Sequence, residues 1–166
     1  MFNRLVKTIL AITSLSPVLL TFWYKYFSDR WHIEDGVIYL ILLLILIIVV
    51  LLLLNLANKK LEKLSVKIES VQNADNEVIS YIFAYLLPLI GFDLKFLVFI
   101  LILFLFIVYT TNIYHFNPIL GLFGYHYYSI TIENGTTFIL ISKKTLMNAK
   151  QINKVVQLDD YTLLEI

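Results

Sequence analysis

Hydrophobic residues run without interruption over positions 37–54, and no charged residue, glycine or proline lies among them. As an α-helix this run is roughly 27 Å long, close to the bilayer hydrocarbon thickness of about 30 Å. A helix that is apolar on every side needs an apolar environment on every side. The pattern therefore predicts a transmembrane helix, and it makes an α-helical polytopic membrane protein the expected fold class.

Three further segments share this apolar character. One covers 5–24 and contains Pro17, which predicts a kink. A shorter segment covers 78–92, and the last covers 94–114. We therefore expect four transmembrane helices. Whether the short third helix crosses the whole bilayer is left open, because it reaches only about 22 Å.

Positive charge predicts the orientation of these helices, because Lys and Arg concentrate in cytoplasmic loops. With a cytoplasmic N-terminus, only Lys25, Arg30 and Lys95 lie outside, and the other ten of the 13 Lys and Arg residues lie inside. Both termini are therefore expected in the cytoplasm. The expected organisation is a first transmembrane hairpin at 1–56, a cytoplasmic connection at 57–77, a second transmembrane hairpin at 78–116 and a small cytoplasmic β module at 117–166.

The C-terminal part of the chain changes to short runs rich in aromatic and β-branched residues. Residues 125–132 and 136–142 flank Asn134-Gly135, and Asn-Gly between two such runs predicts a β-hairpin. A two-stranded hairpin alone is only marginally stable. We therefore expect the rest of the tail to complete a small sheet.

The connection at 57–77 allows two interpretations. Apolar and polar residues alternate from Leu64 to Ile68, as in a half-buried strand. Leu61, Leu64, Ile68 and Val71 also suit one face of a helix. We expect a strand that joins the C-terminal sheet.

The sequence lacks the residue patterns that catalysis and metal binding require. It has no cysteine, and its three histidines, at positions 32, 115 and 126, are not spaced as metal ligands. We expect no enzymatic activity, no metal and no cofactor. The cytoplasmic tail carries lysines suited to anionic lipid or an acidic protein partner, and they are Lys143, Lys144, Lys150 and Lys154. Ordinary positive charge on the cytoplasmic side explains them equally well. Direct nucleic-acid binding is not expected, because no exposed aromatic residues alternate with these lysines.

Few ionisable residues lie within the apolar segments, which argues against an ion pump or carrier. Glu77, Tyr81 and Tyr85 follow one another at helical spacing in the expected third helix. We interpret this face as a helix-packing seam. A conduction path would place polar residues on such a face equally well.

Several short motifs resemble those of one family, and they are Ser14-Leu-Ser-Pro17, Asn76-Glu-Val-Ile-Ser-Tyr81 leading to Tyr85-Leu-Leu-Pro88, and Leu140-Ile-Ser-Lys143. Together with the expected spans and β module, they resemble KwaA, the membrane subunit of the Kiwa antiphage defence system. The resemblance implies a bacterial inner-membrane sensor that assembles as a homo-oligomer, a tetramer. It also implies that the protein detects phage attachment or envelope disturbance and engages a cytosolic DNA-binding partner, KwaB.

This hypothesis assigns roles to the two ends of the molecule. The sensing surface on the periplasmic side would contain Trp23, Tyr26, Trp31 and His32. The β module with its lysines would pass the signal to the partner. A small oligomeric channel or transporter is the alternative function, and a membrane anchor for another cytosolic complex is a third.

Overall fold

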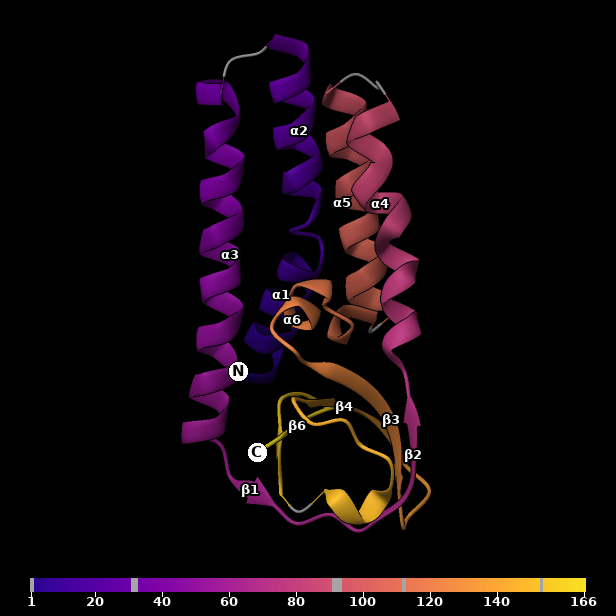
Figure 1. Ribbon diagram of the computed structural model, residues 1–166. Coiled ribbons are helices and arrows are strands. Elements are labelled where there is room, and N and C mark those ends of the chain that lie inside the picture. Colours follow the sequence, from indigo (N-terminus) through magenta and orange to yellow (C-terminus); the bar gives the residue numbers. More distant parts are fainter. Residues whose placement is uncertain (1, 31–32, 91–93, 112, 153) are drawn as a thin grey trace.

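Upright helices form one half of the molecule and a curved sheet forms the other (Figure 1). The computed structural model describes residues 2–30, 33–90, 94–111, 113–152 and 154–166. The α-helices are α1 (Phe2–Ser14), α2 (Val18–Arg30), α3 (Ile33–Lys60), α4 (Ile82–Leu86), α5 (Leu94–Thr110) and α6 (Pro118–Leu122). The 3-10 helices are η1 (Asp75–Tyr81), η2 (Leu87–Ile90), η3 (Ile113–His115) and η4 (Ala149–Gln151).

Two helical stretches in the described part of the chain are long and apolar enough to cross a membrane. One is Arg4–Lys25, which joins α1 and α2, and the other is Gly36–Lys60, which lies within α3. The bent pair Lys95–Thr110 and Ile113–Leu122 would be a third if its two helices, which meet at 98°, form one broken span. The expected fold class of a helical protein with four transmembrane helices is therefore wrong.

Local backbone chemistry explains why the second pair of apolar segments does not form two long helices. The described part of this segment, 78–90, divides into the end of η1, α4 and η2, and Pro88 in η2 cannot donate a backbone hydrogen bond. Helix α5 ends at Thr110, whose hydroxyl bonds to the carbonyl of Phe106 at 2.9 Å. Pro118 disfavours helical backbone at the residue before it, so the chain turns instead of continuing. The apolar composition of these segments predicted that they need an apolar environment, but it did not predict where their helices end.

The kink expected at Pro17 is confirmed. Because Pro17 has no N–H, the carbonyl of Thr13 loses its usual helical donor. The backbone N–H of Ser16 donates to that carbonyl at 3.2 Å, and the Ser16 hydroxyl donates to it at 2.6 Å. The Tyr85 hydroxyl donates to the carbonyl of Ser14 at 2.8 Å. The carbonyl groups of Thr13 and Ser14 at the break between α1 and α2 therefore have hydrogen-bond partners.

The sheet has six strands in the order β1-β5-β6-β4-β3-β2, and only the β4–β6 pair is parallel. The predicted hairpin is confirmed as β3 and β4, which meet at a turn where Gly135 has a φ of +81°. The strands are β1 (Lys63–Leu64), β2 (Ile68–Asn73), β3 (His126–Ile132), β4 (Thr137–Ser142), β5 (Val155–Gln157) and β6 (Thr162–Glu165).

The connection at 57–77, which follows the long helix α3, supplies both edge strands of this sheet. Strands β1 and β2 are separated only by residues 65–67, yet they lie at opposite ends of the strand order. The stretch from Leu64 to Ile68 reaches at most about 14 Å. The edges of a flat sheet of this size would lie about 24 Å apart. The sheet must therefore curl strongly, and its two edges approach each other.

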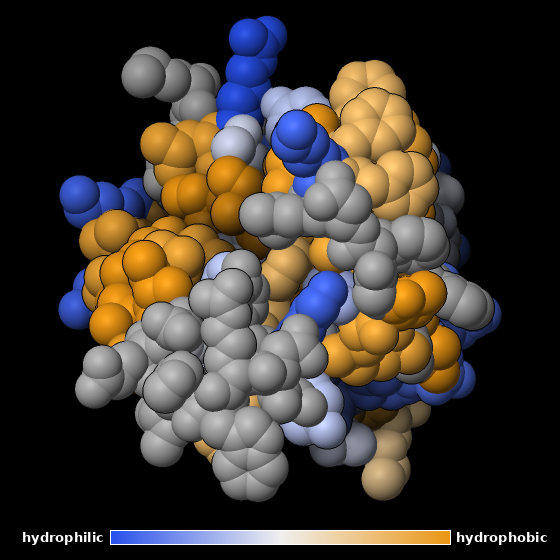
Figure 2. Space-filling view, turned by 90° about the horizontal axis from the view of Figure 1, so that it is seen from above, coloured by the Kyte–Doolittle hydropathy of each residue, from blue (hydrophilic) through white to orange (hydrophobic). Residues whose placement is uncertain are grey.

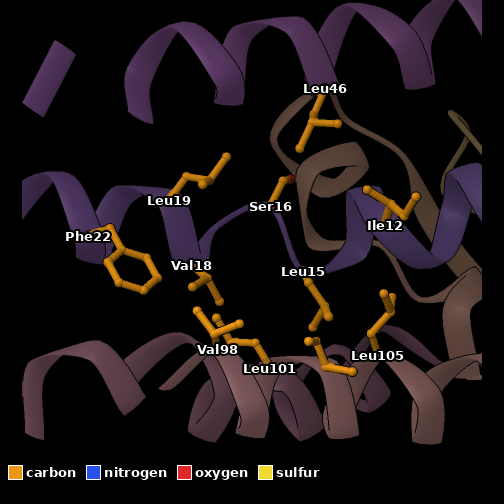
Figure 3. Close-up of a pocket in the computed structure, with 11 residues that line it drawn as sticks. Ile12, Leu15, Ser16, Val18, Leu19, Phe22, Leu46, Val98, Leu101 and Leu105 are labelled. Atoms are coloured by element: carbon orange, nitrogen blue, oxygen red, sulfur yellow. The ribbon is translucent and has the colours of Figure 1, made fainter. Parts of the chain in front are cut away.

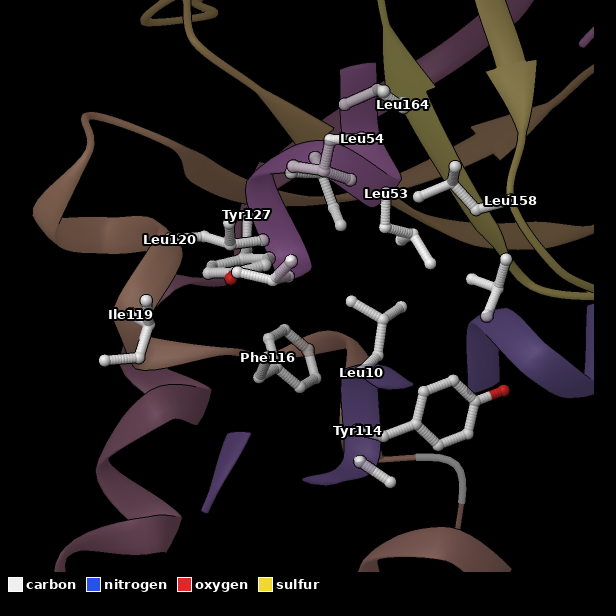
Figure 4. Close-up of a cluster of buried hydrophobic side chains, with 14 of the residues drawn as sticks. Leu10, Leu53, Leu54, Tyr114, Phe116, Ile119, Leu120, Tyr127, Leu158 and Leu164 are labelled. Atoms are coloured by element: carbon white, nitrogen blue, oxygen red, sulfur yellow. The ribbon is translucent and has the colours of Figure 1, made fainter. Parts of the chain in front are cut away.

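Both faces of the sheet are buried. On one face Tyr127 and Leu164 join Leu10 of α1 and Leu54 of α3 in a cluster of apolar side chains that point toward one another (Figure 4). On the other face Leu140 belongs to a second core, together with Tyr128, Ile130, Val155 and Leu163. Neighbouring apolar residues on β4, β5 and β6 alternate between the two cores, as the period of two requires. The first core makes the helices and the sheet one packed unit.

Candidate functional site

The polar contacts between helices and sheet centre on Asn117, which is fully buried. Asn117 is the N-cap of α6, since its side-chain oxygen accepts a hydrogen bond from the N–H of Ile119 at 3.0 Å and Pro118 follows it. Its side-chain amide donates to the hydroxyl of Thr13 on α1 at 2.7 Å. The Thr13 hydroxyl donates in turn to the carbonyl of Ile9 at 2.8 Å. Asn117 therefore ties α6 to the last turn of α1.

Tyr127 of β3 connects the same residue to the sheet. Its buried hydroxyl accepts a hydrogen bond from the backbone N–H of Asn117 at 2.9 Å and donates to the backbone carbonyl of Asn117 at 2.5 Å. Leaving a buried polar group without a partner costs about 1–3 kcal/mol. The contacts of Asn117 and Tyr127 thus fix the position of α1 relative to β3. We call the residues Thr13, Asn117 and Tyr127 the polar junction.

Asp75, which begins η1, extends this connection to the edge of the sheet. One carboxylate oxygen accepts from the backbone N–H of Tyr127 at 2.7 Å, and the other lies 3.0 Å from Nδ2 of Asn73 and 3.1 Å from Nδ1 of His126. Burial by itself raises the pKa of Asp75. The hydrogen bonds from Tyr127, Asn73 and His126 outweigh burial and hold this pKa below its ordinary value. Asp75 is therefore an anion at neutral pH. Hydrogen bonds thus connect the end of α1, through Asn117, Tyr127 and Asp75, with Asn73 at the end of β2.

An open apolar cavity of about 280 Å³ lies beside the break between α1 and α2 (Figure 3). Leu15, Val18 and Phe22 line it from the broken helix, and Leu46 of α3 and Leu101 of α5 line it from the neighbouring helices. Packing does not fill this space, unlike the dense cores on either side of the sheet. The cavity leaves room for the angle between α1 and α2 to change.

The structure places the four lysines of the tail in different surroundings. The Lys143 ammonium lies 4.9 Å from the centre of the Tyr125 ring. The Lys144 ammonium lies 2.7 Å from Oε1 of Glu165, whose side chain is only 3% exposed. Lys150 lies on η4, the gold helix at the end of the sheet away from α2 (Figure 1), and both it and Lys154 are exposed.

Trp23, the first residue of the expected sensing surface, packs between α2 and α3. Its ring stacks on Phe27 with 5.8 Å between centroids. A Cβ added to Gly36 would lie 2.7 Å from Cδ1 of Trp23, so the two helices approach closely here. The indole N–H is buried without a hydrogen-bond partner in the described part of the chain. The side chain of Tyr26 and the whole of Trp31 and His32 lie outside the described residues.

The residues of the expected packing seam have separate surroundings. Tyr85 contacts the carbonyl of Ser14 on α1, as described above. Glu77 is exposed in η1, and the side chain of Tyr81 lies outside the described residues. Across the described residues, no three His, Cys, Asp or Glu side chains come together in a way that could hold a metal ion.

The contacts of the polar junction were not predicted from the sequence. Asn117 and Thr13 are 104 positions apart, and no local pattern pairs them. The step Asn117-Pro118 did carry a usable signal, because Asn followed by Pro is typical of an N-cap and the first helical position. That signal locates the start of α6 but not its contact with α1.

Comparison with known protein families gives a match over most of the chain. The sequence model of a family described as "KwaA: Anti-phage protein KwaA" matches residues 6–164, nearly the entire chain. The chain matches no curated protein and no solved structure.

Proposed function

Since the chain belongs to the KwaA family of anti-phage proteins, we propose that it is the inner-membrane sensor and scaffold subunit of an antiphage defence complex. In this proposal the helices detect phage attachment or envelope disturbance. The sheet lies in the cytoplasm, as do both termini, and engages a cytosolic DNA-binding partner, KwaB. The protein acts as a homo-oligomer, a tetramer, and has no enzymatic activity of its own.

The exposed apolar side chains of the helices support a membrane location. Large apolar residues point outward on α3 and α5, and they include Ile38, Leu44, Ile48, Phe99, Ile102 and Phe106. Seen from the end of the helices, hydrophobic side chains reach the outline of the molecule on several sides (Figure 2). Exposed apolar surface of this extent calls for lipid or for further copies of the chain. A homo-oligomer within the bilayer would supply both.

The polar junction is the observation that carries the sensing mechanism. A change in the angle at Pro17 moves Thr13, because Thr13 lies in the last turn of α1. Thr13 is bonded to Asn117, and Asn117 is bonded to Tyr127 of β3. Movement among the helices would therefore reach the sheet through these hydrogen bonds, because a buried polar group left without a partner costs free energy. Signalling of this kind requires two conformations that differ in these contacts.

The partner would bind at the end of the sheet that points away from the helices. Lys150 lies there on η4, and the neighbouring Met147 is 85% exposed. Lys154 is exposed as well. An exposed methionine beside lysines suits an acidic protein surface with an apolar centre. At the opposite end, Trp23 and the predicted residues Tyr26, Trp31 and His32 would form the periplasmic sensing surface.

The test replaces Asn117 in cells that carry the complete defence system. Asn117→Leu keeps a similar volume and removes the hydrogen bonds of the side chain to Thr13 and Ile119. We expect protection against phage, measured by plaque counts, to fall at least tenfold. The amount of protein in the membrane fraction and the amount of partner that copurifies with it should stay unchanged. Asn76→Leu, at an exposed position in η1, is the control and should protect fully.

A second variant covers the case in which Asn117→Leu does not accumulate. Tyr127→Phe keeps the ring and removes only its hydroxyl, so both hydrogen bonds between Tyr127 and the backbone of Asn117 are lost. Full protection by the variant that accumulates would contradict the proposal. Ionic currents in planar bilayers without any partner would favour the channel alternative instead.

A further inference from the structure

We propose that the cavity between the end of α3 and the sheet binds the phosphate-bearing headgroup of an anionic phospholipid. The cavity has a volume of about 470 Å³. Leu51, Leu54, Asn55 and Asn58 of α3 line one wall, and Lys143 and Lys144 are among the residues that line the other. This inference rests on the membrane location proposed above for α3.

The wall formed by α3 changes character at the depth expected of lipid headgroups. Leu51, Asn55 and Asn58 are spaced by one and two turns, so they share a face of the helix. The apolar run of the sequence ends at Leu54, and Asn55 is the first polar residue after it. In a bilayer the hydrocarbon gives way to headgroups at such a point. The cavity therefore offers an apolar wall to acyl chains and a polar wall to a headgroup.

The opposite wall carries positive charge that is held in place. Glu165 accepts hydrogen bonds from the ammonium of Lys144 and from the hydroxyl of Ser142, so it fixes the end of the Lys144 side chain. An ammonium has three donors, and more than half of the Lys144 side chain is exposed, so donors remain for a second anion. The Lys143 ammonium rests over the Tyr125 ring, a contact that uses none of its donors.

The charge around the cavity favours an oxyanion. Lys143 and Lys144 outnumber the single carboxylate of Glu165 among the charged side chains that line it. Lys59 and Lys60 lie in the last turn of α3, close along the helix to Asn58, and add to the positive potential. A phosphodiester beside a glycerol backbone and acyl chains matches both walls. Lys150 on η4 does not line this cavity and stays available to a protein partner.

The experiment measures lipid retention by native mass spectrometry of the purified full-length protein in detergent. The three probes are phosphatidylglycerol, phosphatidylcholine and soluble glycerol phosphate. We expect the protein to retain phosphatidylglycerol at least fivefold better than phosphatidylcholine, and to retain glycerol phosphate poorly. Retention of glycerol phosphate as strong as that of phosphatidylglycerol would overturn the proposal, because the site would then bind free phosphate groups.

Two double variants with the same change in charge separate the cavity from the general surface. K143Q/K144Q should lower phosphatidylglycerol retention at least fivefold. K67Q/K150Q is the control, because neither lysine lines the cavity, and its retention should match that of the unchanged protein. Equal retention by the two double variants would overturn the proposal. If K143Q/K144Q does not fold, Lys143→Gln alone should lower retention at least twofold, since its exposed side chain makes no ion pair in the described part of the chain.

The outcome is independent of the test of the proposed function. Loss of lipid retention in K143Q/K144Q together with full protection by Asn117→Leu would support the headgroup site and contradict the sensing mechanism. Unchanged lipid retention in K143Q/K144Q together with loss of protection by Asn117→Leu would contradict the headgroup site and support the sensing mechanism.

Discussion

The helical half and the sheet half of this protein are both rich in apolar residues but use them in opposite ways. In the sheet, Leu140 and Ile141 are neighbours on β4, and both are completely buried, one on each face. On α3, Leu44 and Ile48 are 58% and 55% exposed, and only 22% of the candidate span in this helix is buried. The apolar residues of the sheet are covered within one chain, on one face by the helices. The helices leave an apolar surface that only lipid or another chain can cover.

The largest expected effect comes from placing charge on the exposed face of α3. If lipid surrounds this helix as we propose, each arginine near the bilayer centre costs about 2.5–3.5 kcal/mol of insertion free energy. Leu44→Arg combined with Ile48→Arg should therefore cost about 5–7 kcal/mol. We expect most of the protein to be lost from the membrane fraction of cells, as measured by quantitative immunoblotting.

A matched control tests whether the location of the charge matters. Thr137→Arg combined with Gln157→Arg adds the same charge at exposed positions of the sheet. This variant should remain in the membrane fraction at the level of the unchanged protein. Equal amounts of the two double variants in the membrane fraction would contradict the difference proposed between the helices and the sheet.

A smaller effect separates the halves by packing alone. Leu140→Ala removes a completely buried side chain and leaves a cavity, which should lower the free energy of unfolding by about 2–5 kcal/mol. Leu44→Ala is the same change at an exposed position, and its effect should be below about 0.5 kcal/mol. Denaturant unfolding of the purified protein in mild detergent measures both. A cost at Leu44 as large as that at Leu140 would show that α3 is packed within the chain.

The smallest effect concerns the close approach of α2 and α3. Gly36→Ala places a methyl group against Cδ1 of Trp23, and such overpacking should lower the free energy of unfolding by about 1–3 kcal/mol. Gly121→Ala meets nothing within 4 Å and should stabilise α6 by about 0.5–1 kcal/mol. Thermal unfolding of the two variants side by side in detergent gives the comparison. Stabilisation by Gly36→Ala would mean that α2 and α3 are not held together at this point.

The sequence allowed prediction where a feature depends on neighbouring residues. The β3–β4 hairpin follows from Asn134-Gly135, and the break between α1 and α2 follows from Pro17. Both depend on backbone geometry within one turn. The count of spans was wrong because it depends on where helices end. Such ends are set by local backbone constraints, like those of Pro88 in η2 and of the extended residue before Pro118.

The candidate site was less predictable than the fold. The lysines could be found because charge is visible along the chain. The pairing of Lys144 with Glu165 could not, because the two residues are 21 positions apart. The polar junction brings together Thr13, Asn117 and Tyr127, which lie in three distant parts of the chain. Contacts of this kind are selected by tertiary packing, which no local pattern encodes.

The strand order has a consequence for how the protein is made. Strand β6 is synthesised after the other five strands of the sheet, yet it lies in the interior of the sheet between β5 and β4. Before β6 leaves the ribosome, β1 and β5 have no connection through the sheet to β4, β3 and β2. The helices emerge and can enter a membrane long before then. A chain cut short before β6 would lack an interior strand, so the six-stranded sheet can form only after β6 has been translated.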